Sequence, residues 1–283
     1  MGLNDNILHQ LLKSLEKNKH VQSLNLQGNC FTLKGIYMLA EFLKRSYHIK
    51  RINLGYNKIR DEGMIALSEA LKINTSLRKI VLEGNIIGTK GMIAFSEALK
   101  VNTNLNEINL DSNLIGIEGH IALSESLKIN TGLKILHLSN NNLGDKCMIA
   151  LSDALKINTS IKVIDLMSNE TGGEGMMALS HALKINNSLE RVNLKSIHLG
   201  RRINYICDAL MFNKNIRKID LSTNNISDEG MIYFSYALKV NDILQEIDLQ
   251  FNHIGDKGMT ALCDALKINK SLNKINFCSL TLL

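Results

Sequence analysis

Histidine, cysteine, serine and carboxylate side chains are the groups of this chain that could support acid–base, nucleophilic or metal chemistry. The sequence holds eight histidines and five cysteines, yet it contains no His-Glu-x-x-His, no Gly-Lys-Ser/Thr phosphate loop and no nucleophile elbow. No two cysteines have the spacing of zinc ligands. The run Gly172-Gly173-Glu174-Gly175 reads as a turn. We therefore predict that the chain is not an enzyme and has no catalytic residues, no metal and no cofactor.

The elements that position these side chains follow a single frame that recurs every 28 residues. Its clearest copy holds Leu77, Ile80, Leu82, Asn85, Ile87, Gly91, Phe95 and Leu99. The copies begin at Val21, Ile49, Leu77, Leu105, Leu133, Ile161, Leu189, Ile216 and Leu244, with a truncated tenth at Leu272. Every spacing is 28 except the 27 residues from Leu189 to Ile216. A fixed period of this length indicates a solenoid whose repeats pack on their neighbours.

Each copy predicts a short strand, a turn and a helix. The first six positions alternate as in a strand, and after the turn apolar residues recur three or four apart, as in Ile93, Phe95 and Leu99. Repetition of this unit predicts an α/β fold with parallel strands on one face and helices on the other. Strands lie about 4.8 Å apart, whereas packed helices need about 8–10 Å. We therefore expect a horseshoe with strands on its concave face.

Several repeat positions have a structural interpretation. An asparagine after each strand is expected to hydrogen-bond the backbone of adjoining turns, and a glycine is expected where the helix packs closely on its neighbour. Acidic residues three before lysines, such as Glu69 before Lys72, predict ion pairs on the helix surface. Four aspartates near the helix starts are predicted N-caps, Asp61, Asp145, Asp228 and Asp256. These positions serve stability.

This frame resembles the ribonuclease-inhibitor-like class of leucine-rich repeats over residues 21–283. The linker Ile-Asn-Thr-Ser/Gly, at 73–76, 129–132 and 157–160, is similar to the repeats of NOD-like receptor proteins. The resemblance implies the horseshoe fold and a binding surface made of strands and adjoining loops. Its members include enzyme inhibitors, GTPase activators of the Ran type, innate-immune sensors and effectors of intracellular bacteria, so it implies no single function.

Strand alternation puts the third, fifth and seventh repeat positions on the concave surface. These positions vary where the others barely do, as expected for a surface that a partner protein reads. The candidate protein-binding residues there, with two aromatic residues at the eighth position on the rim, are Arg51, Tyr56, Lys79, Glu107, Asp111, Ile135, His137, Val163, Asp165, Met167, Arg191, Lys195, Lys218, Asp220, Asp248 and Phe251.

Four of these residues form a predicted apolar patch at the middle of the arc, Ile135, His137, Val163 and Met167. Apolar and aromatic anchors within a charged ring match the anatomy of protein interfaces. The alternative is that the β-branched residues simply suit a strand. His137 is interpreted as a surface histidine of the binding face rather than as a base. His120 and His181 fall on helix positions that we expect to face solvent.

The seventh repeat departs from the frame. Ile197 replaces the asparagine that follows the strand, and one residue is deleted. The glycine expected where the helix packs on its neighbour is also absent, since residues 201–207 contain none. Arg201 and Arg202 are then predicted to form an exposed basic pair in the strand-to-helix loop. One interpretation is a local kink that presents these arginines to a partner. We favour the other, which is sequence drift that a solenoid tolerates because its stability is spread over many interfaces.

Composition excludes several classes of partner. A net charge of +6 spread over the repeats is no basic patch, and seven Phe, six Tyr and no Trp offer no stacking platform, so we predict no nucleic-acid binding. No apolar stretch is long enough to span a membrane and none resembles a signal peptide. We therefore predict no membrane association and a cytoplasmic location, which extends to host cytosol for a protein secreted without a cleaved signal.

The odd number of cysteines agrees with a reducing compartment. Cys207 takes a core leucine position and Cys147 a glycine position, so both are predicted to be packed thiols. Cys30 and Cys263 are expected at or near the surface, and Cys278 on the concave side of the last strand. The triplets that match a glycosylation sequon, such as Asn74-Thr-Ser, are interpreted as turns in a cytosolic chain.

The two ends of the chain differ from the repeat. Ile7, Leu11 and Leu15 have helical spacing without a preceding strand, so we predict an N-terminal capping helix over residues 1–20 and a repeat domain over 21–283. The C-terminal stretch Ile275–Leu283 is largely apolar and has no polar cap. A solenoid that ends on an uncovered apolar layer is adhesive. Either this end supports self-association or the protein continues beyond it.

The sequence therefore predicts a non-catalytic scaffold that binds a partner protein through its concave strands and adjoining loops. An effector of an intracellular bacterium acting in host cytosol is one role that the resemblance implies. A GTPase regulator of the Ran-activator type, for which Arg60 or Arg201 would have to reach a nucleotide site, is the alternative. A third is the sensing fragment of an immune-receptor-like protein.

Overall fold

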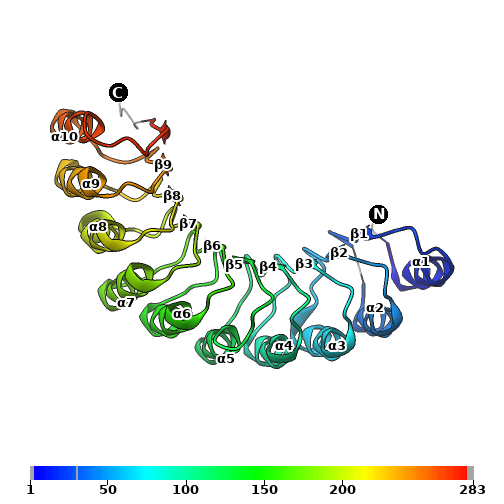
Figure 1. Cartoon of the computed structure of the whole chain (residues 1–283). Coiled ribbons are helices and arrows are strands. Elements are labelled where there is room, and N and C mark those ends of the chain that lie inside the picture. Colours follow the sequence, from blue (N-terminus) through cyan, green and yellow to red (C-terminus); the bar gives the residue numbers. More distant parts are fainter. Residues whose placement is uncertain (1–2, 30, 279–283) are drawn as a thin grey trace. The chain divides into compact units, whose positions relative to one another are not determined.

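A computed structural model describes residues 3–29 and 31–278. Its contacts divide the chain into two compact units, Met1–Asn141 and Asn142–Leu283. Both are built from the predicted succession of short strand, loop and helix (Figure 1). The predicted α/β solenoid of parallel strands and helices is thereby confirmed.

The first unit carries its helices on one side of a parallel sheet. Its elements in order are α1 (Asp5–Lys17), β1 (Ser23–Asn25), α2 (Leu33–Arg45), β2 (Arg51–Asn53), α3 (Arg60–Ile73), β3 (Lys79–Val81), α4 (Thr89–Val101), β4 (Glu107–Asn109), α5 (Ile117–Leu127) and β5 (Ile135–His137). Strands β1 to β5 pair in chain order and in register, so that the first residue of each strand lies beside the first residue of the next.

The second unit repeats this plan with one irregular repeat. Its elements are α6 (Asp145–Ile157), β6 (Val163–Asp165), α7 (Gly173–Ile185), β7 (Arg191–Asn193), the 3₁₀ turn η1 (Gly200–Arg202), α8 (Ile203–Phe212), β8 (Lys218–Asp220), α9 (Asp228–Val240), β9 (Glu246–Asp248), α10 (Asp256–Leu266) and β10 (Lys274–Asn276). Strands β6 to β10 pair in parallel with the same register. The deleted residue of the seventh repeat falls before α8, whose first turn is replaced by η1.

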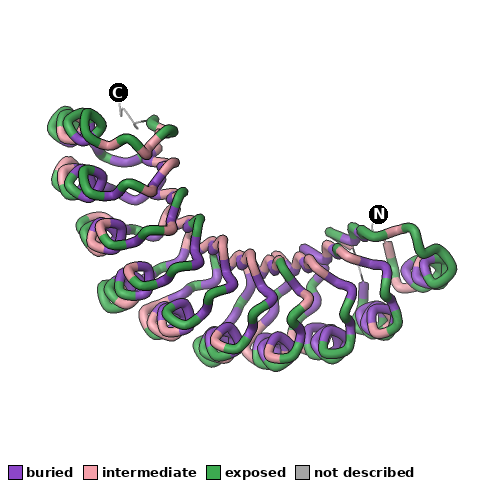
Figure 2. Tube along the Cα trace, in the orientation of Figure 1, coloured by how far each residue is buried: buried purple, intermediate pink, exposed green. Residues whose placement is uncertain are grey.

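The core of each unit lies between its strands and its helices (Figure 2). In the third repeat, Ile80 and Leu82 on the strand side and Phe95 and Leu99 of α4 are all at most 1% exposed. Because neighbouring helices pack on each other and neighbouring strands pair, each repeat covers the apolar face of the next. Burial of this kind is the main favourable term in folding. A repeat without neighbours would leave the face uncovered, which explains why the frame recurs so strictly.

The predicted asparagine ladder after the strands is confirmed. Asn85 is fully buried, and its Nδ2 donates to the carbonyls of Leu54 and Leu82 at 2.9 Å each. Its Oδ1 accepts the N–H of Asn57 at 2.9 Å. Each asparagine thus satisfies backbone groups of its own turn and of the turn before, which would otherwise be buried without partners.

A second asparagine ladder follows the helices, where sequence reasoning had placed simple turns. Asn102 is 3% exposed, and its Nδ2 donates to the carbonyls of Leu71 (2.6 Å) and Asn74 (3.0 Å). Its Oδ1 accepts the N–H of Leu105 at 3.0 Å. The ladder comprises Asn74, Asn102, Asn130, Asn158, Asn186, Asn213, Asn241 and Asn269. The amides of the sequon triplets belong to it, so they are buried structural groups.

The four aspartates predicted to cap their own helices do not do so. Asp145, Asp228 and Asp256 are the first residues of α6, α9 and α10, and Asp61 is the second residue of α3. The Oδ1 atom of Asp228 instead accepts the N–H groups of Gly255 (2.7 Å) and Gly258 (2.8 Å) in the next repeat. The N-cap prediction was wrong, and Asp61, Asp145 and Asp228 accept N–H groups at the start of the following helix instead.

The N-terminal segment contains the predicted helix, with a shifted buried face. In α1 the buried residues are Leu8, Leu12 and Leu15, whereas Ile7 is 45% exposed. Asp5 accepts the N–H of Thr32 at 2.9 Å and so acts toward α2 as Asp228 acts toward α10. At the other end, residues 279–283 of the predicted uncapped layer lie outside the described residues.

Candidate functional site

The candidate site is the face of each sheet that points away from the helices, which we call the strand face. The register places its side chains in three rows. The first row holds the first residue of every strand, the second row the third residue, and the third row the residue two positions further on. These rows correspond to the third, fifth and seventh repeat positions of the sequence prediction.

The second row is largely dictated by the fold. Most of its members are Asn or Asp, and their Oδ1 atoms accept the N–H of the residue two positions later. Examples are Asn53 to Gly55 (3.0 Å) and Asp248 to Gln250 (3.0 Å). The side chain thereby closes the turn that ends the strand. In the first unit, Val81 and His137 are the exceptions to this pattern.

Two charged residues of the first row in the first unit pair with each other, and a histidine of the second row lies near them. Lys79 Nζ lies 2.6 Å from Glu107 Oε1, and His137 Nε2 lies 3.9 Å from the same oxygen. Arg51 is exposed and Ile135 half-buried. Asp111 in the third row accepts the N–H of Ser139 at 2.7 Å. The candidates of this unit are therefore brought to one face.

Tyr56 and Phe251 hold rim positions with an unusual backbone. Both have φ of 56°, in the left-handed region, and their side chains remain 50% and 39% exposed. The Tyr56 hydroxyl donates to the Glu83 carboxylate, and this hydrogen bond raises the pKa of the tyrosine. A Cβ on Gly84 would come within 2.6 Å of the Tyr56 ring, so the ring lies against the next turn. Sequence reasoning found the rings but not this backbone.

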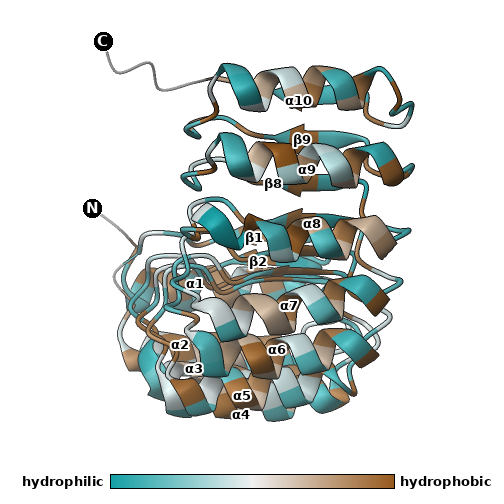
Figure 3. Cartoon of the chain, turned by 90° about the vertical axis from the view of Figure 1, so that its left-hand side faces the viewer, coloured by the Kyte–Doolittle hydropathy of each residue, from teal (hydrophilic) through white to brown (hydrophobic). Residues whose placement is uncertain are grey.

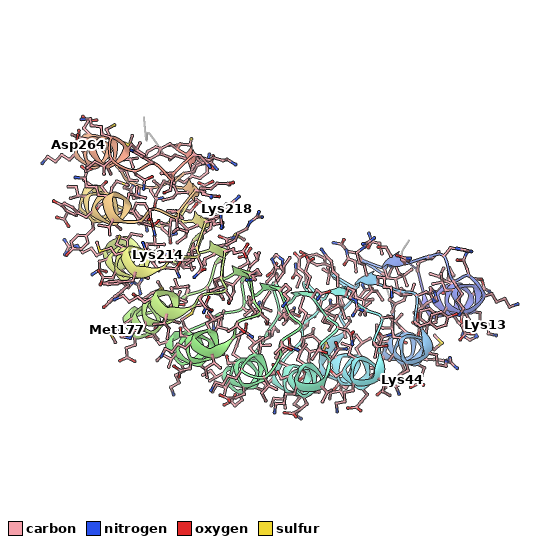
Figure 4. All side chains as sticks on the ribbon, viewed as in Figure 1. Lys13, Lys44, Met177, Lys214, Lys218 and Asp264 are labelled. Atoms are coloured by element: carbon pink, nitrogen blue, oxygen red, sulfur yellow. The ribbon has the colours of Figure 1, made fainter. Side chains whose placement is uncertain are left out.

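The strand face of the second unit carries a dense group of charges. Glu246 lies between two lysines of its row, 3.1 Å from Lys218 Nζ and 3.7 Å from Lys274 Nζ. The hydrogen bond from Lys218 lowers the pKa of Glu246. With Asp220 and Asp248, these side chains line a small pocket of about 80 Å³. Figure 4 shows Lys218 on the strand side of the unit, away from the helices.

The remaining candidates of this unit surround that group. Arg191 is exposed at the start of β7, and Lys195 is half-buried in the third row. Asp165 accepts the side-chain amide of Asn193 at 2.9 Å and the N–H of Met167 at 2.9 Å. Val163 and Met167 are half-buried. The predicted apolar patch is thus divided between the units, with Ile135 and His137 in the first and its other members in the second.

The prediction that His120 faces solvent is wrong, whereas His181 is exposed as expected. His120 is 1% exposed at a position of α5 where other repeats have a buried methionine. Its Nδ1 lies 3.1 Å from the Gly116 carbonyl, while its Nε2 is buried without a hydrogen-bond partner. Burial lowers the pKa of His120 to about 4. The neutral ring therefore packs as part of the core.

The prediction that Arg201 and Arg202 are both exposed is wrong for Arg202. The Arg201 side chain is 91% exposed and lies 3.9 Å from Glu229. The Arg202 guanidinium is half-buried and donates to the carbonyls of Thr171 (2.7 Å) and His198 (2.6 Å). Arg202 therefore stabilises the irregular repeat and is not offered to a partner. Arg60, considered for a nucleotide site, is exposed at the start of α3.

A row of exposed apolar residues at the ends of the helices was missed by sequence reasoning. Its members are 56–65% exposed and comprise Ile73, Val101, Ile129, Ile157, Ile185, Phe212, Val240 and Ile268. Figure 3 shows hydrophobic segments at this end of the helices of the second unit. The signal was present in the sequence as an apolar residue immediately before each asparagine of the second ladder.

The cysteines and acidic groups form no metal-ligand cluster in the part of the chain that the structure describes. Cys147 and Cys207 are buried, as predicted, and burial raises the pKa of the Cys207 thiol. Cys263 and Cys278 are exposed, and Cys30 lies outside the described residues. Among residues 3–29 and 31–278, no three His, Cys, Asp or Glu side chains gather as metal ligands would. Over the same residues, no helix combines the length and hydropathy needed to cross a bilayer.

Comparison with known proteins identifies the family. A model described as Leucine Rich repeat matches residues 17–40, 46–68, 74–96, 130–152, 158–180, 212–235 and 240–263. These segments make up more than half of the chain, and most of the irregular seventh repeat lies outside them. The chain belongs to the leucine-rich repeat family, which confirms the resemblance read from the repeats. No curated protein sequence matches it.

Two solved structures illustrate the shared fold. The leucine-rich repeat-containing protein LegL7 from Legionella pneumophila is 14% identical, with a TM-score of 0.59 and 91% of each chain covered. TLR13, solved in a complex with an RNA named ssRNA13, is 16% identical with a TM-score of 0.57; the match covers 94% of this chain and 37% of that one. At such identities the likeness concerns the fold.

Proposed function

We propose that the chain is a non-catalytic scaffold that binds a partner protein through its strand face and the adjoining loops. The observation that carries this proposal is the placement of Tyr56 and Phe251. In other repeats the same left-handed position holds Gly, Ser, Asn or Thr, as at Gly84 and Ser168. A bulky residue in this conformation costs of order 1–2 kcal/mol. Exposed aromatic rings kept at that cost are typical of binding anchors.

The biological role that we attach to this scaffold is narrower. We propose an effector of an intracellular bacterium that acts in host cytosol, because the family resemblance includes such proteins and LegL7 shares the fold. The alternative is that the same surface binds a partner in the cytoplasm of the protein's own cell. No contact of Arg60 or Arg201 favours the GTPase regulator over the scaffold.

Affinity capture from host-cell and bacterial cytosol tests the proposal. Tyr56→Ser with Phe251→Ser removes the anchors, and serine is already tolerated at this position in Ser112 and Ser168. Val163→Glu with Met167→Glu tests the adjoining strand face. The matched control is Tyr37→Ser with Tyr236→Ser, which removes two exposed rings from the helices.

The proposal expects a protein that wild type and the control retain and that the strand-face variants lose. Proteins retained equally by all variants, at unchanged thermal stability, would place binding elsewhere and overturn it.

A further inference from the structure

The strand face of the second unit separates its charges into two neighbouring rows. The first row carries Arg191, Lys218 and Lys274, with Glu246 between the two lysines. The second row carries carboxylates. Among the described residues, no lysine or arginine lies within 4.0 Å of the carboxylates of Asp220 and Asp248. Half-buried carboxylates that have no cation of their own are ready to accept one from a partner.

The negative charge of this row exceeds what the fold needs. Closing the turn after a strand requires only an Oδ1 acceptor, and Asn193 provides it to Lys195 at 3.0 Å as Asp220 provides it to Ser222 at 2.9 Å. In the first unit the corresponding row holds no carboxylate, and asparagine closes the turn at Asn53. The acidic row of the second unit therefore serves something other than the turn.

The spacing of the rows limits the kind of partner that fits. Neighbouring positions along a row are about 4.8 Å apart, and the two rows lie about 6.6 Å apart along the strands. Side chains three or four positions apart on a helix are separated by about 5–6 Å. A helix that lies across the strands can thus place one charged side chain over each strand it crosses.

We infer that the second unit's strand face takes a partner helix on which a line of basic side chains runs beside a line of acidic ones. The basic line pairs with the second row, and the acidic line pairs with the first. This inference rests on the proposed function, since it specifies the partner of the same face. Because these charges are partly exposed, their contribution falls with rising salt.

Two synthetic helical peptides of identical composition test it. In the segregated peptide, Glu occupies one edge and Lys the other; in the mixed peptide, both edges alternate Glu and Lys. Fluorescence anisotropy of each labelled peptide is measured against the full chain at low and physiological salt. We expect the segregated peptide to bind more tightly, with the difference shrinking as salt rises. Equal affinity for the two peptides at both salt concentrations overturns the inference.

Protein variants locate the binding. Asp220→Asn with Asp248→Asn removes two charges while keeping the turn acceptors, as Asn193 shows. We expect the segregated peptide to lose about two- to fivefold in affinity for each charge removed. The control, Asp242→Asn with Asp264→Asn, makes the same change in net charge at exposed positions, one just after α9 and one within α10, and should leave affinity unchanged. Figure 4 shows Asp264 on the helix side of the unit.

Equal losses in the two variants would indicate a general charge effect and overturn the inference. The capture experiment with Tyr56 and Phe251 does not depend on these carboxylates. The capture variants could lose a partner protein while the two peptides bind equally well. That combination would support the proposed scaffold and contradict only the inference about the charge pattern of its partner.

Discussion

The carboxylate of Asp61 caps the helix of the following repeat, because its Oδ1 atom accepts the backbone N–H of Gly91 at 2.9 Å. A Cβ on Gly91 would lie 2.8 Å from that oxygen. The aspartate of one repeat and the glycine of the next therefore form one structural unit. The same pair recurs along the chain, because Asp5, Asp145 and Asp228 are followed in the next repeat by Gly35, Gly175 and Gly258. The glycine also occurs without the aspartate, as at Gly119 after Thr89.

Gly91→Ala should therefore destabilise the protein by about 1–3 kcal/mol, the usual cost of overpacking, although alanine is the better helix former. Urea denaturation of Asp61→Ala, Gly91→Ala and the double variant measures the coupling. We expect the double variant to lose less stability than the sum of the single variants. Gly173→Ala, in the first turn of α7 with no atom within 4 Å of the added Cβ, is the control. If the stability losses of the two single variants simply add in the double variant, Asp61 and Gly91 do not form one structural unit.

The second asparagine ladder makes a separate prediction. Asn74→Ala removes donors to the buried carbonyls of Leu43 (2.6 Å) and Ser46 (2.9 Å). Both carbonyls keep a weaker or second donor, so we take the loss of these buried hydrogen bonds together as about 1–3 kcal/mol. Denaturation with urea should show a loss in this range, and hydrogen exchange should rise around α2 and α3. Thr75→Ala, at the exposed neighbouring position, should change stability by less than about 0.5 kcal/mol. A similar loss in both variants would mean that the ladder contributes little.

The repeat period alone allowed the strands, the helices and surface pairs such as Lys72–Glu69 to be predicted, because each depends on positions within one repeat. The first ladder joins neighbouring repeats, but an asparagine at the same position of nearly every copy revealed it. The features that were missed depend on contacts between repeats. Asp61 looked like a cap for α3, since a sequence does not show that a neighbouring helix presents the nearer N–H groups. Asn102 looked like a turn residue for the same reason.

The candidate site could be predicted only in part. Alternation correctly placed residues such as Lys218 on the strand face. It could not show that Asp248 closes a turn, because that role depends on a backbone N–H rather than on a side-chain pattern. The left-handed backbone of Tyr56 is likewise invisible in the residue type.

The two arginines of the seventh repeat should differ sharply. Arg202→Ala removes a guanidinium that donates to two backbone carbonyls, so we expect a loss of about 1.5–3 kcal/mol. Arg201→Ala, whose side chain is 91% exposed, should stay within about 0.5 kcal/mol of wild type. Thermal and urea unfolding of both variants measure this difference. Equal effects would restore the interpretation of an exposed basic pair.

Stability below neutral pH should depend on His120, whose folded-state pKa is lowered to about 4 from the ordinary 6.5 by burial. In the folded protein the ring stays neutral over this interval, whereas the unfolded chain binds a proton. Its contribution is therefore complete above pH 6.5 and is lost as pH falls toward 4, by at most about 1.4 kcal/mol per pH unit. His120→Met, with the residue found at Met92 and Met148, should flatten this part of the urea-derived stability profile. The exposed His181→Met should not, and a parallel profile for His120→Met and wild type would show that the buried ring is protonated without cost.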